Sequence, residues 1–267
     1  MLWCILINTT PNYMRYAEVQ ITCIRRYAKE FIDIPIFLAT EVLPSDPIVA
    51  RILQQQNVRF LSLPKAESDF LESRVAAFKY LPLEYDVVLP LQEDFWLDRR
   101  PDSRAIKEAI HYMETDDHVH SVRLMPSPGP HESDMPYKGN RLWRVLSSLD
   151  TYRFTFQATL WRRQPYIDFL QAIIDAGKAV YYESTYYENW SKFCVKVNIA
   201  ENTKGQAIFK AVCMSGDAVH LSAQREHKGS NAVFLCPWPY RPTAVVQGQL
   251  EPWAKEFMGR EGFHLPL

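Results

Sequence analysis

The chain has 267 residues, of which 47% are hydrophobic, so it is long enough to bury one large core. Its formal net charge of -1 excludes a global basic field of the kind that attracts nucleic acid or an anionic membrane. Five cysteines without a CxxC pair favour reduced thiols in a cytoplasmic protein. No stretch approaches the roughly 18 apolar residues of a membrane span, and the short apolar N-terminus predicts a strand and not a signal peptide.

The first part of the chain alternates short apolar runs with amphipathic stretches. The apolar runs predict buried strands at residues 2–7, 34–39, 58–63 and 87–91. The stretches between them predict helices at residues 13–31, 47–56 and 68–80. The second of these helices has Asp46 as its expected N-cap and Pro47 at its first position. Such alternation predicts an α/β fold with a parallel sheet and right-handed crossovers.

The second part of the chain is predicted to extend this sheet. Helices are expected at residues 103–113, 165–176, 185–197 and 251–259. Strands are expected at residues 118–125, 142–146, 154–161, 207–214 and 218–223. The last two strands are expected to pair antiparallel, as a small C-terminal elaboration. The sequence contains no linker, repeat or low-complexity tract, so we predict a single domain over residues 1–267.

The fourth predicted strand ends in the most unusual stretch of the sequence. Its apolar run is followed at once by Gln92, Glu93, Asp94, Phe95 and Trp96. Two acids at the end of a buried strand, walled by aromatic rings, are unfavourable unless something balances their charge. Mg²⁺ or Mn²⁺ takes carboxylate oxygens and often binds through one or two carboxylates plus substrate phosphates. We therefore predict a metal–diphosphate site here, or alternatively an ion pair with Arg99 or Arg100.

Polar side chains also follow the first two strands. Thr9 and Thr10 follow the first strand, and Glu41 follows the second. Ligands bind outside the carboxyl ends of the strands in open parallel sheets, so these residues are expected on one rim with Glu93 and Asp94. The threonines contact a nucleotide or simply cap the next helix. Glu41 binds a ribose or base, or is a solvated loop acid.

This order of elements, with a strand that ends in an acidic pair, resembles a GT-A-type glycosyltransferase. LQEDFWL is similar to the acidic motif of bacterial and large-virus glycosyltransferase-like proteins, although it has adjacent acids in place of D-x-D. The resemblance extends to SRVAAFKYLPLEYDVV before the motif and to FQATLWRR and YYENWSKF after it. It implies a GT-A-like, Rossmann-type, mostly parallel sheet flanked by helices. It also implies a nucleotide-sugar-binding half at residues 1–125 and an acceptor-side half at residues 126–267.

The resemblance also implies roles for residues outside the acidic motif. Arg74 would contact the base or the diphosphate, unless it lies on an exposed helix face. His227 would complete a metal shell with Asp94 and Glu93, and Lys228 would hold the diphosphate leaving group. The alternative for both is a solvated loop.

Glu188 is a candidate general base for deprotonating an acceptor hydroxyl. The stretch Thr185-Tyr186-Tyr187-Glu188 equally fits a capping box, in which Glu188 only caps its helix. Trp161 and Trp143 either extend the acceptor site or belong to the core.

The sequence lacks the motifs of several other enzyme classes. It contains no GxGxxG, GxxxxGK[ST], HExxH or GxSxG. These absences argue against dinucleotide oxidoreductases, P-loop enzymes, zincin proteases and standard α/β-hydrolases. The acidic strand end and the resemblance together imply a hexosyl- or deoxyhexosyltransferase that uses Mn²⁺ or Mg²⁺, a nucleotide-sugar donor and a glycan or other hydroxyl acceptor, with no nucleic-acid partner. The alternatives are a nucleotidyl- or phosphoryl-transfer enzyme and a non-catalytic nucleotide- or carbohydrate-binding module.

Overall fold

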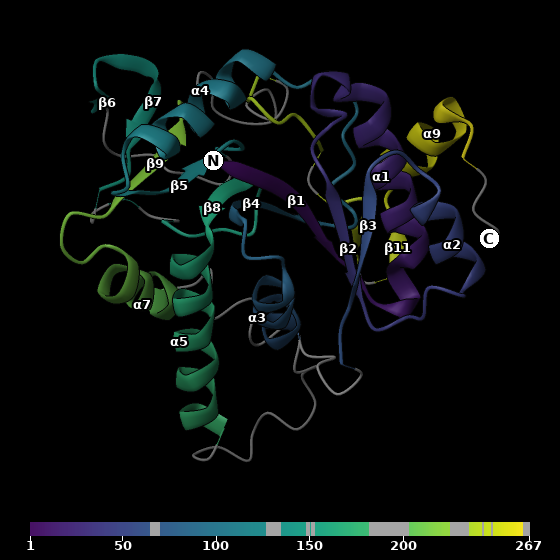
Figure 1. Cartoon of the computed structure of the whole chain (residues 1–267), viewed down its shortest axis with the longest axis horizontal. Helices are drawn as coiled ribbons and strands as arrows, with labels where there is room; N and C mark the ends of the chain where they lie inside the picture. The colour runs from purple at the N-terminus through teal and green to yellow at the C-terminus, as the bar shows by residue number, and fades with distance from the viewer. Residues whose placement is uncertain are drawn as a thin grey trace.

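The fold is built on one nine-stranded sheet, seen in a computed structural model of the whole chain (Figure 1). The structure describes residues 1–64, 70–126, 135–147, 150, 153–181, 203–224, 235–241, 243–246 and 248–263. The strand order is β3-β2-β1-β4-β8-β5-β9-β7-β6. The bounds of the first five strands are Leu2–Asn8 (β1), Ile36–Thr40 (β2), Val58–Ser62 (β3), Tyr85–Gln92 (β4) and Val119–Arg123 (β5). Those of the other four are Pro136–Tyr137 (β6), Asn140–Val145 (β7), Thr159–Arg162 (β8) and Val219–Ala223 (β9).

The sheet is parallel over β3, β2, β1 and β4 and mixed beyond them. β8 runs antiparallel to both of its neighbours, β4 and β5. β9 is parallel to β5 and antiparallel to β7. A separate antiparallel pair, β10 (Val245–Val246) and β11 (Gln249–Leu250), lies near the end of the chain. The predicted Rossmann-type sheet with a small antiparallel C-terminal elaboration is thus confirmed, but the antiparallel pair is β10 and β11 and not the two strands expected at residues 207–214 and 218–223.

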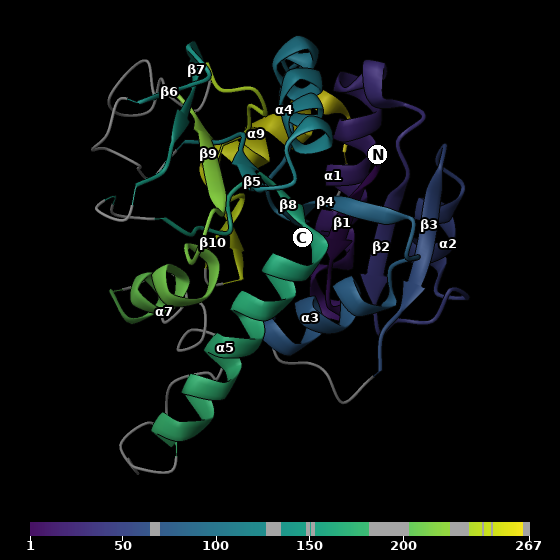
Figure 2. The same cartoon turned by 60° about the vertical axis from the view of Figure 1, so that its left-hand side comes forward.

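Helices cover both faces of the sheet, as Figures 1 and 2 show. α1 (Met14–Tyr27), α2 (Pro47–Leu53), α4 (Ser103–Thr115) and α9 (Pro252–Glu261) pack with one apolar cluster. α3 (Phe70–Tyr80), α5 (Arg163–Tyr181) and α7 (Thr203–Cys213) pack with the other. Alternate side chains of a strand point to opposite faces, so Ile5 and Ile7 of β1 join the first cluster while Cys4 and Leu6 join the second. A strand buried on both faces is apolar throughout, which is why the run at residues 2–7 was readable in the sequence.

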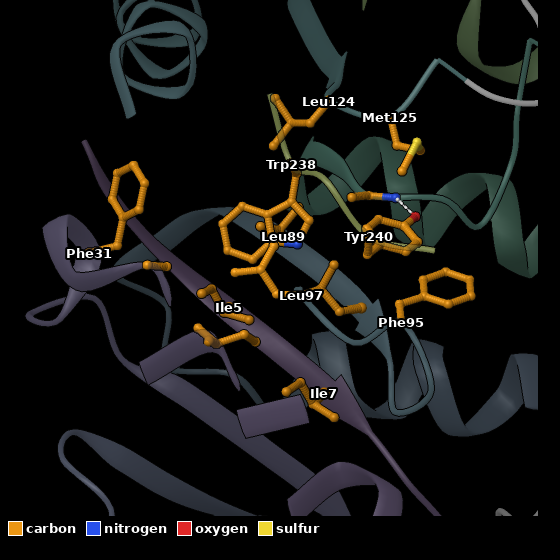
Figure 3. Packing of buried hydrophobic residues seen from close by; sticks show 14 of the residues in the cluster. Ile5, Ile7, Phe31, Leu89, Phe95, Leu97, Leu124, Met125, Trp238 and Tyr240 are labelled. Carbon is orange, nitrogen blue, oxygen red and sulfur yellow. Dashed lines mark hydrogen bonds between the residues drawn. The ribbon is translucent and has the colours of Figure 1, made fainter. Parts of the chain in front are cut away.

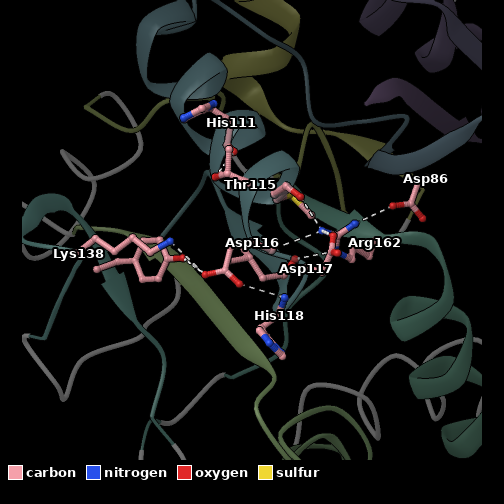
Figure 4. Close-up of polar contacts among 11 residues, drawn as sticks. Asp86, His111, Thr115, Asp116, Asp117, His118, Lys138 and Arg162 are labelled. Carbon is pink, nitrogen blue, oxygen red and sulfur yellow. Dashed lines mark hydrogen bonds and ion pairs between the residues drawn. The ribbon is translucent and has the colours of Figure 1, made fainter.

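Arg162, the last residue of β8, ties α4 to the sheet (Figure 4). Its guanidinium donates to the main-chain oxygens of Val119, at 3.0 Å, and of Met113, at 2.5 Å. It also pairs with the carboxylates of Asp86 and Asp117. A cation is favourable at the C-terminus of a helix, and this one satisfies carbonyls that the last turn of α4 leaves open.

Two of the predicted strands are wrong. Residues 207–214 lie in α7 and its end, and β8 begins only at Thr159, five residues after the predicted start at 154. A nearly continuous apolar run cannot be assigned to strand or helix from periodicity alone. In the structure Phe209 and Cys213, four positions apart, are buried on one side of α7. The predicted helix at residues 185–197 lies outside the described residues.

The remaining predicted elements are confirmed with shifted ends. The helix predicted at residues 13–31 is α1 followed by the 3₁₀ turn η2 (Lys29–Phe31), and a 3₁₀ turn η1 (Pro11–Tyr13) precedes it. Asp46 caps α2 as expected, because its carboxylate accepts from the Ile48 and Val49 N–H groups. None of the helices in the described ranges combines the length and apolar character that a membrane crossing needs.

Candidate functional site

The candidate site lies where strands β1, β2 and β4 end together. Asn8, the last residue of β1, is in register with Ala39 of β2 and with Gln92 of β4. The chain leaves β1 toward β2 and returns to pair β4 on the other side, so the strand order reverses at β1. Ligands of doubly wound sheets bind in the crevice at such a switch point. The sequence prediction of one shared rim is confirmed at the level of the backbone.

Half-buried Glu93 and buried Asp94 leave this rim as an acidic pair, which we call the acidic tip. Burial raises the pKa of the Asp94 carboxyl to about 6. Burial, and then the neighbouring charge of Asp94, raises the pKa of the Glu93 carboxyl to about 7. Phe95 and Trp96 are buried beside them, as the sequence suggested. The tip therefore holds two carboxyl groups whose ionisation the protein opposes.

The arginines named as alternative partners of the acidic tip pair elsewhere. Arg99 forms an ion pair with Asp98 at 3.0 Å, and Arg100 pairs with Glu30. Neither forms an ion pair with Glu93 or Asp94, so this alternative is wrong.

The acidic tip is fastened by the C-terminal part of the chain. The Ala244 N–H donates to the Asp94 main-chain oxygen at 3.0 Å, and a hydrogen bond from the Val245 main chain lowers the pKa of the Asp94 carboxyl, partly offsetting burial. A β-bridge joins Leu97 to Tyr240, and Figure 3 shows the Tyr240 ring beside Phe95. These contacts join distant parts of the chain, so no local sequence pattern indicates them.

Arg74 is buried on α3 and lies near the acidic tip. Its Nη1 donates to the Phe70 main-chain oxygen at 3.2 Å, and its guanidinium carbon lies 3.4 Å from the centroid of the Phe70 ring. It forms no ion pair with any described carboxylate, although its charge lowers the pKa of both Glu93 and Asp94. The alternative of an exposed helix face is therefore wrong.

Arg74 lines a small hollow beside the rim, on the face of the sheet that α3 and α5 cover. The other lining residues are Asn8, Pro90, Leu91, Gln92, Thr155, Phe156, Gln157, Trp161 and Tyr166. Trp161, one of the two predicted acceptor-site tryptophans, is among them, whereas Trp143 is buried elsewhere and donates to Glu108 at 2.7 Å. Gln157 and Tyr166 were not singled out from the sequence, because nothing in a short apolar stretch shows which side chain faces a hollow.

The nucleotide-side candidates follow β1 and β2 as predicted. Thr9 is buried and its N–H donates to the Ala39 main-chain oxygen at 3.0 Å. Thr10 is exposed, and its side chain makes no capping hydrogen bond to the 3₁₀ turn that follows. Glu41 is half-buried directly after β2. Their contacts with a nucleotide stay predictions.

The other candidates cannot be placed. Glu188, His227 and Lys228 lie outside the described residues, and their roles as base, metal ligand and phosphate ligand stay predictions. In the ranges that the structure describes, no three His, Cys, Asp or Glu side chains form a cluster able to hold a metal ion. The acidic tip nevertheless fits Mg²⁺ or Mn²⁺, since such ions often take one or two carboxylates and complete their shell with substrate phosphates and water.

No protein-family model matches the chain, and no curated protein sequence matches it. Several solved structures share its architecture at low identity. An active-site mutant of LgtC is 13% identical, with a TM-score of 0.47, over 98% of this chain and 97% of that one. A cytidylyltransferase from Leptospira borgpetersenii is 11% identical, with a TM-score of 0.45, over 98% and 95%. S. aureus TarS residues 1–349 in complex with UDP-GlcNAc is 11% identical, with a TM-score of 0.46; the match covers 87% of this chain and only 60% of that 1–349 chain. These likenesses concern overall architecture and do not distinguish glycosyltransferases from cytidylyltransferases.

Proposed function

We propose that this protein transfers a sugar from a nucleotide-diphosphate sugar to an acceptor hydroxyl, with Mg²⁺ or Mn²⁺ held at the acidic tip. The observation that carries the proposal is the acidic pair at the switch point of the sheet, half-buried Glu93 and buried Asp94, with the pKa of both carboxyl groups raised. Neither carboxylate forms an ion pair within the described residues. Buried charges of this kind are normally paired or bound to a metal.

A divalent cation at the tip would neutralise charge that develops on the departing diphosphate. Asp94 is the better ligand of the two, because the Ala244 and Val245 main chains fix its position. Glu93 supplies a second carboxylate or orients a ribose hydroxyl. Arg74 adds positive charge that a diphosphate would meet on the α3 side. Glu188 is the proposed base, His227 a further metal ligand and Lys228 a further phosphate ligand.

Thr9, Thr10 and Glu41 belong to the nucleotide end of the proposed site. They follow β1 and β2, next to the strand that carries the acids. Main-chain N–H groups and hydroxyls at such strand ends suit the phosphates and ribose, and a carboxylate suits ribose hydroxyls or a base N–H. The sugar would then lie beyond the acids, on the side of β4 that faces away from β1.

Product analysis tests the proposal. The protein is incubated with Mn²⁺ and a panel of UDP-, GDP- and CDP-sugars, and the nucleotide products are separated. A glycosyltransferase releases the nucleoside diphosphate as it transfers the sugar to water or to an added sugar acceptor. Release of nucleoside monophosphate or pyrophosphate would instead support phosphoryl or nucleotidyl transfer, and intact donors that bind without turnover would support a binding module.

The variant Asp94→Asn is expected to lower this release by about 100-fold or more, because it removes the charge of the main cation ligand while keeping the side-chain shape. Asp33→Asn, at an exposed position, is the matched control and is expected to retain full activity. Unchanged release by a folded Asp94→Asn protein would contradict the metal role.

A further inference from the structure

Gln157 and Tyr240 form a hydrogen-bonded pair at the edge of the hollow. The Tyr240 hydroxyl accepts from the Ala158 N–H at 2.9 Å, the contact drawn as a dashed line in Figure 3. It donates to Oε1 of Gln157 at 2.5 Å. Gln157 is half-buried and lines the hollow together with Arg74 and Gln92.

The chemistry of the tyrosine hydroxyl fixes which end of the Gln157 amide faces it. A phenol has a single proton to donate. The Ala158 N–H already donates to the Tyr240 oxygen, so that proton needs another acceptor, and the Gln157 carbonyl oxygen is the acceptor in contact. The Tyr240 hydroxyl donates to this carbonyl oxygen, so the carbonyl end of the Gln157 amide faces Tyr240. The Gln157 NH₂ group therefore points away from Tyr240, and it has no hydrogen-bond partner within the described residues.

Tyr240 is held too firmly to let this orientation change easily. Its side chain is fully buried, and its ring stacks on Phe95 with centroids 4.8 Å apart and planes 17° apart. Phe95 directly follows Asp94, and the Leu97–Tyr240 bridge joins the same two segments. One packed unit thus sets the position of the Gln157 amide relative to the acidic tip.

The topology places Gln157 next to the acids along the rim. β8 pairs antiparallel with β4, so the residues that precede β8 lie at the end where β4 stops. Along the rim, the loops after β2 and β1 come first, the acidic tip after β4 comes next, and Gln157 lies beyond it. In a nucleotide sugar, the group beyond the diphosphate is the sugar.

We propose that Gln157 is a specificity-determining residue whose NH₂ group donates to an oxygen of the sugar, and that Tyr240 is the positioning residue that orients it. The inference rests on the proposed function, since it takes the diphosphate to bind at the acidic tip. A sugar hydroxyl or ring oxygen is a suitable acceptor for the N–H of a half-buried amide at the edge of a small hollow. A rigidly held donor discriminates between ligands, because a ligand that lacks its acceptor leaves the buried donor unpaired.

The test is calorimetric binding of two ligand pairs in the presence of Mn²⁺: UDP with UDP-glucose, and GDP with GDP-mannose. Gln157→Met removes the donor without adding charge. For the ligand pair that the wild-type protein binds, it is expected to lower the affinity for the nucleotide sugar by roughly 10-fold and the affinity for the nucleoside diphosphate by less than about 2-fold. Tyr240→Phe keeps the stacked ring but removes the hydrogen bond that orients the Gln157 amide. It is also expected to weaken binding of the nucleotide sugar. Gln54→Met and Tyr80→Phe, both at exposed positions, are matched controls.

The outcomes separate this inference from the proposed function. If a folded Gln157→Met protein loses affinity equally for both ligands, or for neither, the role of Gln157 is overturned. Binding of the nucleotide by the wild-type protein would still stand. Failure of the wild-type protein to bind any of the four ligands would overturn this inference, whereas the proposed function is overturned only if the panel of UDP-, GDP- and CDP-sugars also yields no nucleoside diphosphate. If Tyr240→Phe unfolds, Gln157→Met still decides, because its side chain lies at the edge of the hollow and not in the core.

Discussion

Glu93 and Asp94 carry their charge where the protein does little to balance it. Burial raises the pKa of both carboxyl groups, and among the described residues the offsetting contributions are the Arg74 charge and main-chain hydrogen bonds. Such an arrangement costs stability, and it is common at sites where function requires the charge. At the residue scale, the account therefore predicts that neutralising an acid stabilises the protein in the absence of metal.

Glu93→Gln is expected to raise the free energy of unfolding on the order of 1–3 kcal/mol at pH 8 in EDTA. The folded pKa of Glu93, about 7, exceeds the ordinary value of 4.5. Ionised Glu93 is therefore destabilising above pH 7, and the advantage of the variant should vanish as the pH falls to 4.5. Urea denaturation at pH 8 and pH 4.5 checks this, with Glu256→Gln, at an exposed position, as the control. A variant less stable than wild type at pH 8 would contradict the account.

His220, which joins three packed elements, also makes stability depend on pH. It lies on β9 and is fully buried, with Nδ1 2.8 Å from the Ser121 hydroxyl of β5 and Nε2 2.8 Å from the Cys213 main-chain oxygen of α7. A carbonyl oxygen can only accept, so Nε2 carries the proton and Nδ1 accepts from Ser121. Burial then lowers the pKa of His220 to about 4.

Because His220 is neutral in the folded protein, the packing of α7, β9 and β5 around it should become less stable at low pH. The folded pKa lies below the ordinary 6.5, so the unfolded chain binds the extra proton between those two values and stability falls as the pH drops from 6.5 to 4. The loss should amount to about 2–3 kcal/mol. His220→Gln should abolish that part of the pH dependence, whatever its own stability, whereas His111→Gln, at an exposed position, should retain it. Equal slopes for His220→Gln and wild type would refute the assignment.

The elements also show why part of the fold was predictable from the sequence. β1 and β2 are buried almost throughout, and α2 begins at the capping Asp46, so their signals are strong and local. The edge strand β3 is half-buried or exposed along its length, and its signal comes from its apolar residues alone. The sequence of α7 was mistaken for a strand because its apolar run hides the helical period. Which of its side chains are buried, Phe209 and Cys213, depends on packing against α5 and β9. Local sequence carries no information on that packing.

The candidate site was predictable to the same extent. Glu93 and Asp94 stand out because two acids after a buried strand are unusual, and the rim follows from strand order alone. Gln157, Tyr240 and the Val245 main chain were missed because they come from segments more than 60 residues away in sequence, and only tertiary structure brings them together. Arg74 was named, but its burial was not foreseen, because α3 turns it toward the sheet.

Across the whole molecule, the nine-stranded sheet brings the parts of the proposed donor site to one edge. Under the proposed function, the loops after β1 and β2 would bind the nucleotide, the acidic tip after β4 would bind the cation, and Gln157, beside the small hollow before β8, would contact the sugar. The C-terminal segment closes over the tip through Tyr240 and Ala244. The central claim is that a cation at the acidic tip binds the diphosphate.

The most direct measurement of that claim is calorimetric titration of the protein with UDP, GDP and CDP, in Mn²⁺ and again in EDTA. The account predicts that at least one of them binds about 10-fold or more tightly in Mn²⁺, and that Asp94→Asn removes the difference while Asp33→Asn keeps it. Binding of equal affinity in Mn²⁺ and EDTA, or a Mn²⁺ effect that survives Asp94→Asn, would contradict it.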